Sequence, residues 1–254
     1  MHTGEAVAVS PHLDDAVFSA GGTIAALVAA GWRVRVITCF TATVLDPTPF
    51  APSPFALSTQ LDKGIAPDVD YMAIRRAEDA AACAVLGAEP VHLLLPEAPH
   101  RGYDCAAALF AGVRADDTVG LALRAALEEH LRGADLVLAP QAIGDHVDHR
   151  VVAELVAALR PDALWWRDAP YILRRPDAVR WHVVPAGTEQ AVDIGPHLDT
   201  KIAAAHCYAT QLGFQFGGLE HVAALLRELA ATEARRVGAT TPSEVLTGVA
   251  SRIT

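Results

Sequence analysis

We predict the architecture from residues 6–30, AVAVSPHLDDAVFSAGGTIAALVAA, in which an apolar run, a polar turn and a second apolar run follow one another. The run from Ala6 to Val9 predicts a buried strand, because a strand covered on both faces is apolar throughout. The longer run from Asp15 to Ala30 predicts a helix of about four turns. The polar turn between them therefore lies where a strand ends and a helix begins.

The same alternation continues along the chain. Further buried strands are expected at Val34 to Cys39, Val91 to Leu95 and Leu136 to Ala139. Further helices are expected at Met72 to Leu86, Thr118 to Leu131 and His149 to Leu159. Strands that alternate with helices indicate an α/β fold, here a Rossmann-like, mostly parallel sheet with helices on both faces. Ligands bind such sheets outside the carboxyl ends of the strands.

The last third of the chain is less regular. Strand-like pieces occur at Val179 to Val184 and Ala191 to Ile194, and helices are expected near Asp199 to Cys207 and His221 to Thr232. A length of 254 residues with 52% hydrophobic side chains suits one substantial core. Because there is no internal repeat, low-complexity linker or shift in composition, we expect a single domain spanning residues 1–254.

One segment, Thr41 to Tyr71, is longer than a structureless loop of about 12 to 15 residues usually is. Its prolines are Pro47, Pro49, Pro52, Pro54 and Pro67. It leaves the strand next to the one that ends at the polar turn, so we expect it to border the mouth of a pocket as a lid or an interaction loop. An insertion without a role is the alternative.

Charge and cysteine content limit the class of protein. The net charge of -10 makes nucleic acid and an anionic membrane improbable partners and favours a small neutral or polar substrate. The four cysteines are far apart and form no CxxC pair, which indicates reduced, mostly buried thiols. No secretory signal is visible, and the most apolar stretch, Ala16 to Ala30, is too short to cross a bilayer. These features predict a cytoplasmic protein.

The first polar cluster, Ser10-Pro11-His12-Leu13-Asp14-Asp15, occupies the first strand-to-helix turn. His12 and Asp15 can approach one metal ion from this turn, while Asp14 points elsewhere and can reach a bound water. Asp is also common at helix N-termini as a cap, so Asp14 or Asp15 has a purely structural alternative.

The second cluster, Gly144-Asp145-His146-Val147-Asp148-His149, follows the fourth expected strand and again precedes a helix. Adding His149 to His12 and Asp15 gives three protein ligands and leaves a position for water, as in catalytic zinc sites. Fe(II), Co and Ni also accept such nitrogen and oxygen ligands. A helix cap by Asp148 and a surface histidine pair are the structural alternatives.

These residues resemble the LmbE/PIG-L family of zinc-dependent N-acetylglucosaminyl deacetylases. The resemblance rests on His12-x-Asp14-Asp15 and His146-x-Asp148-His149, and more weakly on Arg75-x-x-Glu78 with Leu86-Gly87 and on the segment from Lys201 to Gln211. It covers most of the chain up to about Gln211. Three positions depart from the family: Leu13 replaces a common Pro, Ala16 a common Glu and Tyr208 a common His.

The resemblance implies a role for each residue. It implies that zinc is held by His12, Asp15 and His149, and that Asp14 is the general base. It further implies that His146 stabilises the oxyanion and donates a proton, that Asp148 orients His146, and that Arg75 contacts the substrate. A local ion pair of Arg75 with Glu78 or Asp79 is the alternative for that residue.

The expected activity is metal-dependent removal of an acetyl or other acyl group from the amide nitrogen of an amino sugar or a glycosylated small molecule. An amidase of the same mechanism, acting on a thiol conjugate or another acylated amine, remains open. So does a Rossmann-like protein with a structural metal and no catalysis. A serine hydrolase and a nucleotide-loop protein are disfavoured, because GxSxG, GxGxxG and GxxxxGK[ST] are all missing.

Overall fold

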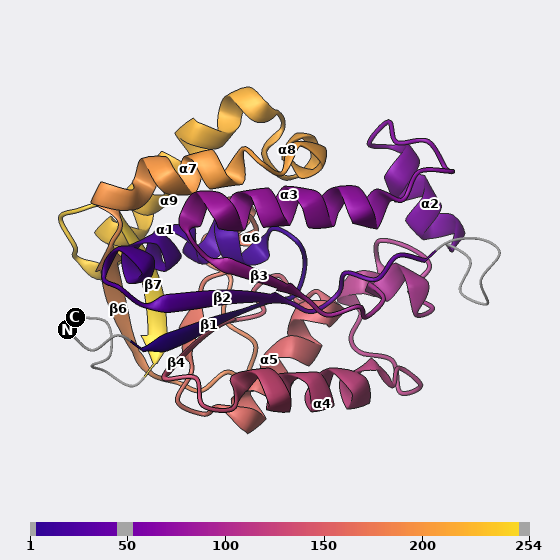
Figure 1. Ribbon diagram of the computed structural model, residues 1–254, viewed down its shortest axis with the longest axis horizontal. Helices are drawn as coiled ribbons and strands as arrows, with labels where there is room; N and C mark the ends of the chain where they lie inside the picture. The colour runs from indigo at the N-terminus through magenta and orange to yellow at the C-terminus, as the bar shows by residue number, and fades with distance from the viewer. Residues whose placement is uncertain (1–3, 45–52, 249–254) are drawn as a thin grey trace.

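The computed structural model describes residues 4–44 and 53–248, and within them seven strands form one sheet in the order β3-β2-β1-β4-β5-β7-β6 (Figure 1). The strands are β1 (Glu5–Ser10), β2 (Arg33–Thr38), β3 (Glu89–His92), β4 (Leu136–Pro140), β5 (Leu164–Trp166), β6 (Thr188–Asp193) and β7 (Ser243–Gly248). Strands β1 to β5 are parallel, whereas β7 runs antiparallel to both β5 and β6. The predicted α/β, mostly parallel sheet is confirmed.

Strand order determines where a site can form. The chain builds outward from β1 through β2 to β3, then returns to the other side of β1 with β4, where Ala8 pairs with Leu138. Crossover connections therefore diverge between β1 and β4, and this reversal point is where open α/β sheets bind ligands. The two polar clusters follow these two strands.

Helices cover both faces of the sheet (Figure 1). They are α1 (Asp15–Ala29), α2 (Pro54–Leu61), α3 (Tyr71–Leu86), α4 (Val119–Leu131), α5 (Val147–Leu159), α6 (Tyr171–Arg174), α7 (Leu198–Ala205), α8 (Ala209–Phe216) and α9 (Leu219–Val237). Helices α1, α3, α7 and α9 pack on the face that carries Ala8 and Val36, and α4 and α5 pack on the face that carries Val7 and Val9. Alternate residues of each central strand thus enter separate cores.

The predicted elements can now be compared with the structure. The first four strands and the four helices expected up to residue 159 are present, with shifted ends; β3, for example, begins at Glu89 instead of Val91. The strand expected at Val179 to Val184 is wrong: Trp181 donates its backbone N–H to Gln141, and Val184 donates back to Trp181 in a turn. Of the segment Thr41 to Tyr71, residues 45–52 lie outside the described part, and the remainder contains helix α2.

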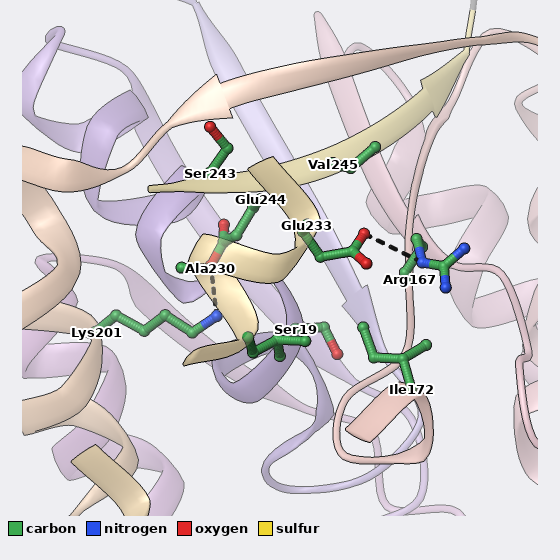
Figure 2. Close-up of a pocket in the computed structure, with 10 residues that line it drawn as sticks. Ser19, Arg167, Ile172, Lys201, Ala230, Glu233, Ser243, Glu244 and Val245 are labelled. Atoms are coloured by element: carbon green, nitrogen blue, oxygen red, sulfur yellow. Dashed lines mark hydrogen bonds and ion pairs between the residues drawn. The ribbon is translucent and has the colours of Figure 1, made fainter. Parts of the chain in front are cut away.

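Strand β7 was not predicted because three of its six buried residues, Ser243, Glu244 and Thr247, are polar. Glu244, under helix α1, accepts hydrogen bonds from Thr23 and from the backbone of Gly22, and it pairs with Lys201 at 2.6 Å. Figure 2 shows this pair beside the Arg167–Glu233 pair, at a hollow of about 300 Å³. Lys201, part of the segment that resembles the family, therefore holds α7 against β7.

The glycine pair inside α1 allows close packing. A Cβ atom at Gly22 would lie 2.7 Å from the side chain of Ile194, so any larger residue would push α1 away from the chain that follows β6.

Two of the four cysteines are buried, so the expectation of mostly buried thiols is met in part. All four cysteines are free; Cys39 and Cys83 are buried, Cys207 is half-buried and Cys105 is exposed. Within the described ranges, no helix has the length and apolar character needed to cross a bilayer.

Candidate metal centre and active site

The two polar clusters meet at the carboxyl ends of β1 and β4. Their three imidazole rings lie 5.0 to 5.6 Å apart between centroids, with His12 packed against both His146 and His149. Parallel pairing of β1 with β4 explains this convergence, since both strands deliver their ends to the same edge. The two clusters that the sequence puts at the ends of two strands thus lie side by side.

Local backbone contacts hold each turn in shape. Ser10 Oγ donates to the carbonyl of His12 and accepts from the N–H of Ala16, which ties the strand end to the start of α1. In the other turn, Gly144 has φ 99°, and a Cβ atom there would lie 2.3 Å from the ring of Tyr171. Glycine is required at this position by both the backbone conformation and the neighbouring ring.

Two histidine nitrogens and one carboxylate oxygen face a common point. Asp15 Oδ2 lies 3.2 Å from His12 Nδ1 and 3.2 Å from His149 Nε2. His149 is completely buried, yet its Nε2 has no hydrogen-bond partner within the described part of the chain. A buried nitrogen without a partner is costly unless something else binds it. The set His12, Asp15 and His149 has the donor chemistry and spacing to hold a metal ion.

The remaining nitrogen of each of these histidines is bound by a carboxylate. His12 Nε2 lies 2.9 Å from Asp148 Oδ2, and His149 Nδ1 lies 2.9 Å from Asp168 Oδ1. A carboxylate behind a histidine fixes the ring and its tautomer and raises its basicity toward a metal. Asp168 was missed from the sequence, because it follows β5, a three-residue strand that was not predicted.

Asp148 is surrounded differently from the sequence-based expectation. Its carboxylate accepts from Arg101 at 2.7 Å and from the N–H of Ala98 at 3.1 Å, in addition to His12. In the described residues its contact with His146 is made by the backbone N–H, which donates to His146 Nδ1 at 3.2 Å. Despite burial, His12 and Arg101 hold the pKa of Asp148 well below its usual range. Arg101 had no local sequence signal.

A second trio, His12, His146 and Asp148, also lies within metal-binding distance. It fits a metal less well, because both Asp148 oxygens already accept hydrogen bonds and His146 Nδ1 accepts from the backbone. His149 Nε2, by contrast, has no hydrogen-bond partner in the described residues and lies 3.2 Å from Asp15, the other member of the first trio. The first trio therefore fits a metal ion better.

Asp14 is a buried carboxylate beside this trio, 4% exposed. None of residues 4–44 and 53–248 donates a hydrogen bond to its side chain. Burial, together with the charge of Asp15, raises the pKa of Asp14 to about 8, and the positive charge of Arg75 acts against that rise. A carboxylate with this environment has unused acceptor capacity and an affinity for protons suited to a general base.

The histidines differ in their protonation. Burial alone would lower the pKa of His149, but the carboxylates of Asp15 and Asp168 raise it to about 9. Burial and the neighbouring charge of His12 instead lower the pKa of His146 to about 3. Neutral His146 accepts at Nδ1, so its proton sits on Nε2.

Arg75 lies under the site instead of on the surface. Its guanidinium pairs with Glu97, and its side chain is only 7% exposed. The local partners considered from the sequence are engaged elsewhere: Glu78 binds Thr210, and Asp79 binds His92 and Tyr208. Tyr208, where the family commonly has His, thus has a buried hydrogen-bonding role.

The aromatic residues divide between the core and the site. Trp165 and Trp166 are fully buried core residues. The rings that border the centre are Tyr171, 5.5 Å from His149, and Phe110, 5.5 Å from His146. Phe110, 44% exposed, was not singled out from the sequence.

Asp168→Asn provides a test of the support behind His149. The amide keeps the volume but cannot hold the ring by charge, so metal affinity is expected to fall about 10- to 100-fold. Competition titration with a chelator measures it. The conservative control is Asp193→Asn, away from the centre, which should leave the affinity unchanged. Equal affinity in Asp168→Asn and the parent would contradict the assigned role.

Comparisons with known proteins agree with this geometry. The model of the PIG-L family, described as GlcNAc-PI de-N-acetylase, matches residues 7–159. The 2'-N-acetylparomamine deacetylase of Streptomyces fradiae is 34% identical over 226 residues, covering 83% of this chain and 75% of that protein.

Two solved structures extend the similarity to the whole fold. The A40926 pseudoaglycone deacetylase Dbv21 superposes with a TM-score of 0.80 at 27% identity, over 97% of each chain. The zinc-inhibited form of the teicoplanin deacetylase Orf2 gives a TM-score of 0.77 at 25% identity, over 96% of this chain and 97% of that one. With the family match and the His/Asp trio that fits a metal ion, these similarities show that the chain belongs to the PIG-L/LmbE family and is an N-deacetylase.

Proposed function

We propose that the protein hydrolyses the N-acetyl group of an amino sugar carried by a glycosylated small molecule, using one divalent metal ion. The observation that carries the proposal is Asp14, a buried carboxylate without a hydrogen-bond partner in the described residues, beside a trio that fits a metal. The similar deacetylases act, by their names, on 2'-N-acetylparomamine, the A40926 pseudoaglycone and teicoplanin. These support a glycosylated natural product as the substrate class.

His12, Asp15 and His149 would hold the metal, and zinc is the first candidate. A bound divalent ion lowers the pKa of water and polarises an amide carbonyl. A zinc-inhibited form is known for the similar teicoplanin deacetylase, so Fe(II), Co and Ni belong in the same assay.

Asp14 accepts the proton of the water that attacks the acetyl carbon. The Nε2–H of His146 donates a hydrogen bond to the carbonyl oxygen as negative charge develops there. The C–N bond then breaks as Asp14 passes the proton that it took from water to the leaving nitrogen, and acetate and a free amine are released. This division of work is supported by the Asp14 carboxylate, which accepts no hydrogen bond from the described residues, and by the Asp148 N–H that donates to His146 Nδ1.

Two further residues have positioning roles in this proposal. Asp148 orients His12 through its carboxylate and His146 through its backbone N–H. Arg75, fixed by Glu97, directs positive charge toward Asp14 and toward hydroxyl or carbonyl oxygens of the substrate.

Incubation of the metal-loaded protein with a panel of N-acylated amines tests the function. The panel contains N-acetylglucosamine, 2'-N-acetylparomamine, an N-acylglucosaminyl glycopeptide and an N-acetylated glucosaminyl thiol conjugate, with release of free amine as the measurement. Release from the sugars supports the proposal. Exclusive release from the thiol conjugate favours the alternative amidase, and no release from any compound favours a non-catalytic metal protein.

The purified protein is expected to bind about one divalent ion per chain, since one three-ligand set is available. Binding must displace the proton that His149 otherwise holds up to a pKa of about 9. Apparent affinity should therefore rise about tenfold per pH unit for each displaced proton, from about pH 7 to about pH 9. Calorimetric titration at several pH values measures it; an affinity independent of pH would refute displacement of a histidine proton.

A further inference from the structure

The connection from β3 to α4, residues 93–118, lies wholly within the described part of the chain and has only two 3-10 turns as helical structure. An irregular connection longer than about 12 to 15 residues usually has a function. This one reaches the catalytic centre, where the N–H of Ala98 donates to the carboxylate of Asp148 at 3.1 Å. It also brings a buried positive charge to the same carboxylate, the guanidinium of Arg101.

Every nitrogen of the Arg101 side chain has an acceptor. Nη2 donates to Asp148 Oδ1 at 2.7 Å and to Asp117 Oδ2 at 3.0 Å. Nε donates to Asp117 as well, and Nη1 donates to the carbonyl of Pro96 at 2.7 Å. Only 8% of the side chain is exposed. A planar guanidinium bound in all these directions has one orientation, so it holds the Asp148 carboxylate firmly.

Asp148 passes this constraint to His12. Its Oδ1 is taken by Arg101, which leaves Oδ2 to accept from His12 Nε2 at 2.9 Å. Because Nε2 is bound in this way, Nδ1 is the ring nitrogen that remains for a metal ion, and it lies 3.2 Å from Asp15 Oδ2. A rotation of the Asp148 carboxylate would therefore turn the His12 ring and move its ligand atom.

Phe40 provides a second route from Arg101 to His12. The guanidinium lies 4.9 Å from the centroid of the Phe40 ring, within the range of a cation–π contact. Phe40 is completely buried, and its ring centroid lies 6.1 Å from that of His12. Arg101 thus restrains His12 through a carboxylate on one side and through a packed ring on another.

We propose that Arg101 is a positioning residue of the metal centre. It fixes the Asp148 carboxylate, and through it the imidazole of His12, so that Nδ1 is presented to the metal ion together with Asp15 and His149. The inference rests on the proposed metal-dependent function. It is tested first by metal binding, which is measured without any substrate.

Three substitutions examine the charge of Arg101. Arg101→Met retains most of the length and removes the charge, so zinc affinity should fall about 10- to 100-fold. Arg101→Lys keeps a positive charge without the planar fork and should recover part of that loss. Arg114→Met is the matched control, because Arg114 is an exposed arginine of the same connection that pairs with Asp116, and it should leave the affinity unchanged.

Asp117→Asn separates positioning from mere support of the connection. It removes the charge of the other carboxylate that binds Arg101 but leaves the contact between Arg101 and Asp148 in place. Asparagine can still accept from the N–H of Val119, as Asp117 Oδ1 does at the start of α4. We therefore expect Asp117→Asn to keep the zinc affinity within about twofold of the parent.

Three measurements are made on every variant. Thermal melting of the metal-free protein verifies folding, and competition titration with a chelator gives the zinc affinity. The visible absorption of the cobalt-loaded protein reports the geometry of the ligands, so it should change in Arg101→Met and stay that of the parent in Asp117→Asn and Arg114→Met. At saturating metal, kcat should fall about tenfold in Arg101→Met, with KM within about twofold, because Arg101 acts only through other residues.

Parent affinity and parent absorption in every Arg101 variant that folds would overturn the positioning role. An equal loss of affinity in Asp117→Asn and Arg101→Met would also overturn it, because Arg101 would then only support the connection. No turnover of any sugar by the parent would instead overturn the proposed function, and the zinc affinities and cobalt spectra would still decide the role of Arg101.

Discussion

Substitution of His149 by alanine is expected to lower metal affinity by more than about 100-fold and to reduce deacetylation to the background of the assay. His149 is one of three ligands, and the two that remain hold a divalent ion poorly. The loss should exceed the about 10- to 100-fold expected for Asp168→Asn, which removes only the support behind the ring. Metal stoichiometry after desalting and turnover on the best sugar of the panel measure both effects.

Because His149 is fully buried, its removal also leaves Asp15 and Asp168 without their partner, and folding has to be verified. His149→Gln retains most of the volume and hydrogen-bonding capacity and should fold like the parent while still losing metal. His221→Ala, on the exposed surface of α9, is the control and should keep both metal and activity. Full metal occupancy in both His149 variants would mean that the ion is held elsewhere.

The sequence was most informative where candidate catalytic residues directly follow predicted strands. The apolar strands at Ala6 to Val9 and Leu136 to Ala139 are each followed, at once or after a short loop, by a turn that contains His and Asp. Such a polar turn cannot be part of the buried core. Their positions therefore predicted both the sheet and the edge at which a site would form. The structure adds that β1 and β4 are direct neighbours, so the two clusters can share one metal.

The residues that were missed have partners far away along the chain. Arg101 reaches Asp148 across 47 positions. Asp168, which contacts His149, follows β5, a strand of three residues that is too short to show a hydrophobic period. The same holds for Arg75, whose partner Glu97 is 22 positions away, while the sequence offered Glu78 nearby. Such contacts depend on how helices and strands pack against one another, and the local sequence does not reveal that packing.

Strand β7 shows the same effect in the core. Glu244 and Thr247 are buried at 6% and 5% exposure, but they flank only two apolar residues, Val245 and Leu246, in a short segment that resembles a solvent-exposed strand or loop. Their burial is tolerated because Lys201, Thr23 and Gln141 supply hydrogen bonds. A polar residue can occupy a core position once a distant residue satisfies it, and pattern alone does not reveal the partner.

The two neighbouring aspartates are expected to separate ligand from base. Asp14→Asn should retain about one metal ion per chain, because the Asp14 carboxylate is outside the trio that fits a metal. Its deacetylation rate should fall about 10²- to 10⁴-fold, the usual loss for a general base. Asp15→Asn should lose metal as well as activity, since Asp15 Oδ2 lies between His12 and His149.

Side-by-side measurement of metal content, melting temperature and turnover distinguishes the two variants. Asp14→Asn also removes the carboxyl whose burial and proximity to Asp15 raise its pKa to about 8, so this variant should fold at least as well as the parent at neutral pH. If Asp14→Asn lost its metal while Asp15→Asn kept it, the two carboxylates would have exchanged roles. If Asp14→Asn kept full activity, the water would have to be deprotonated by a group other than Asp14.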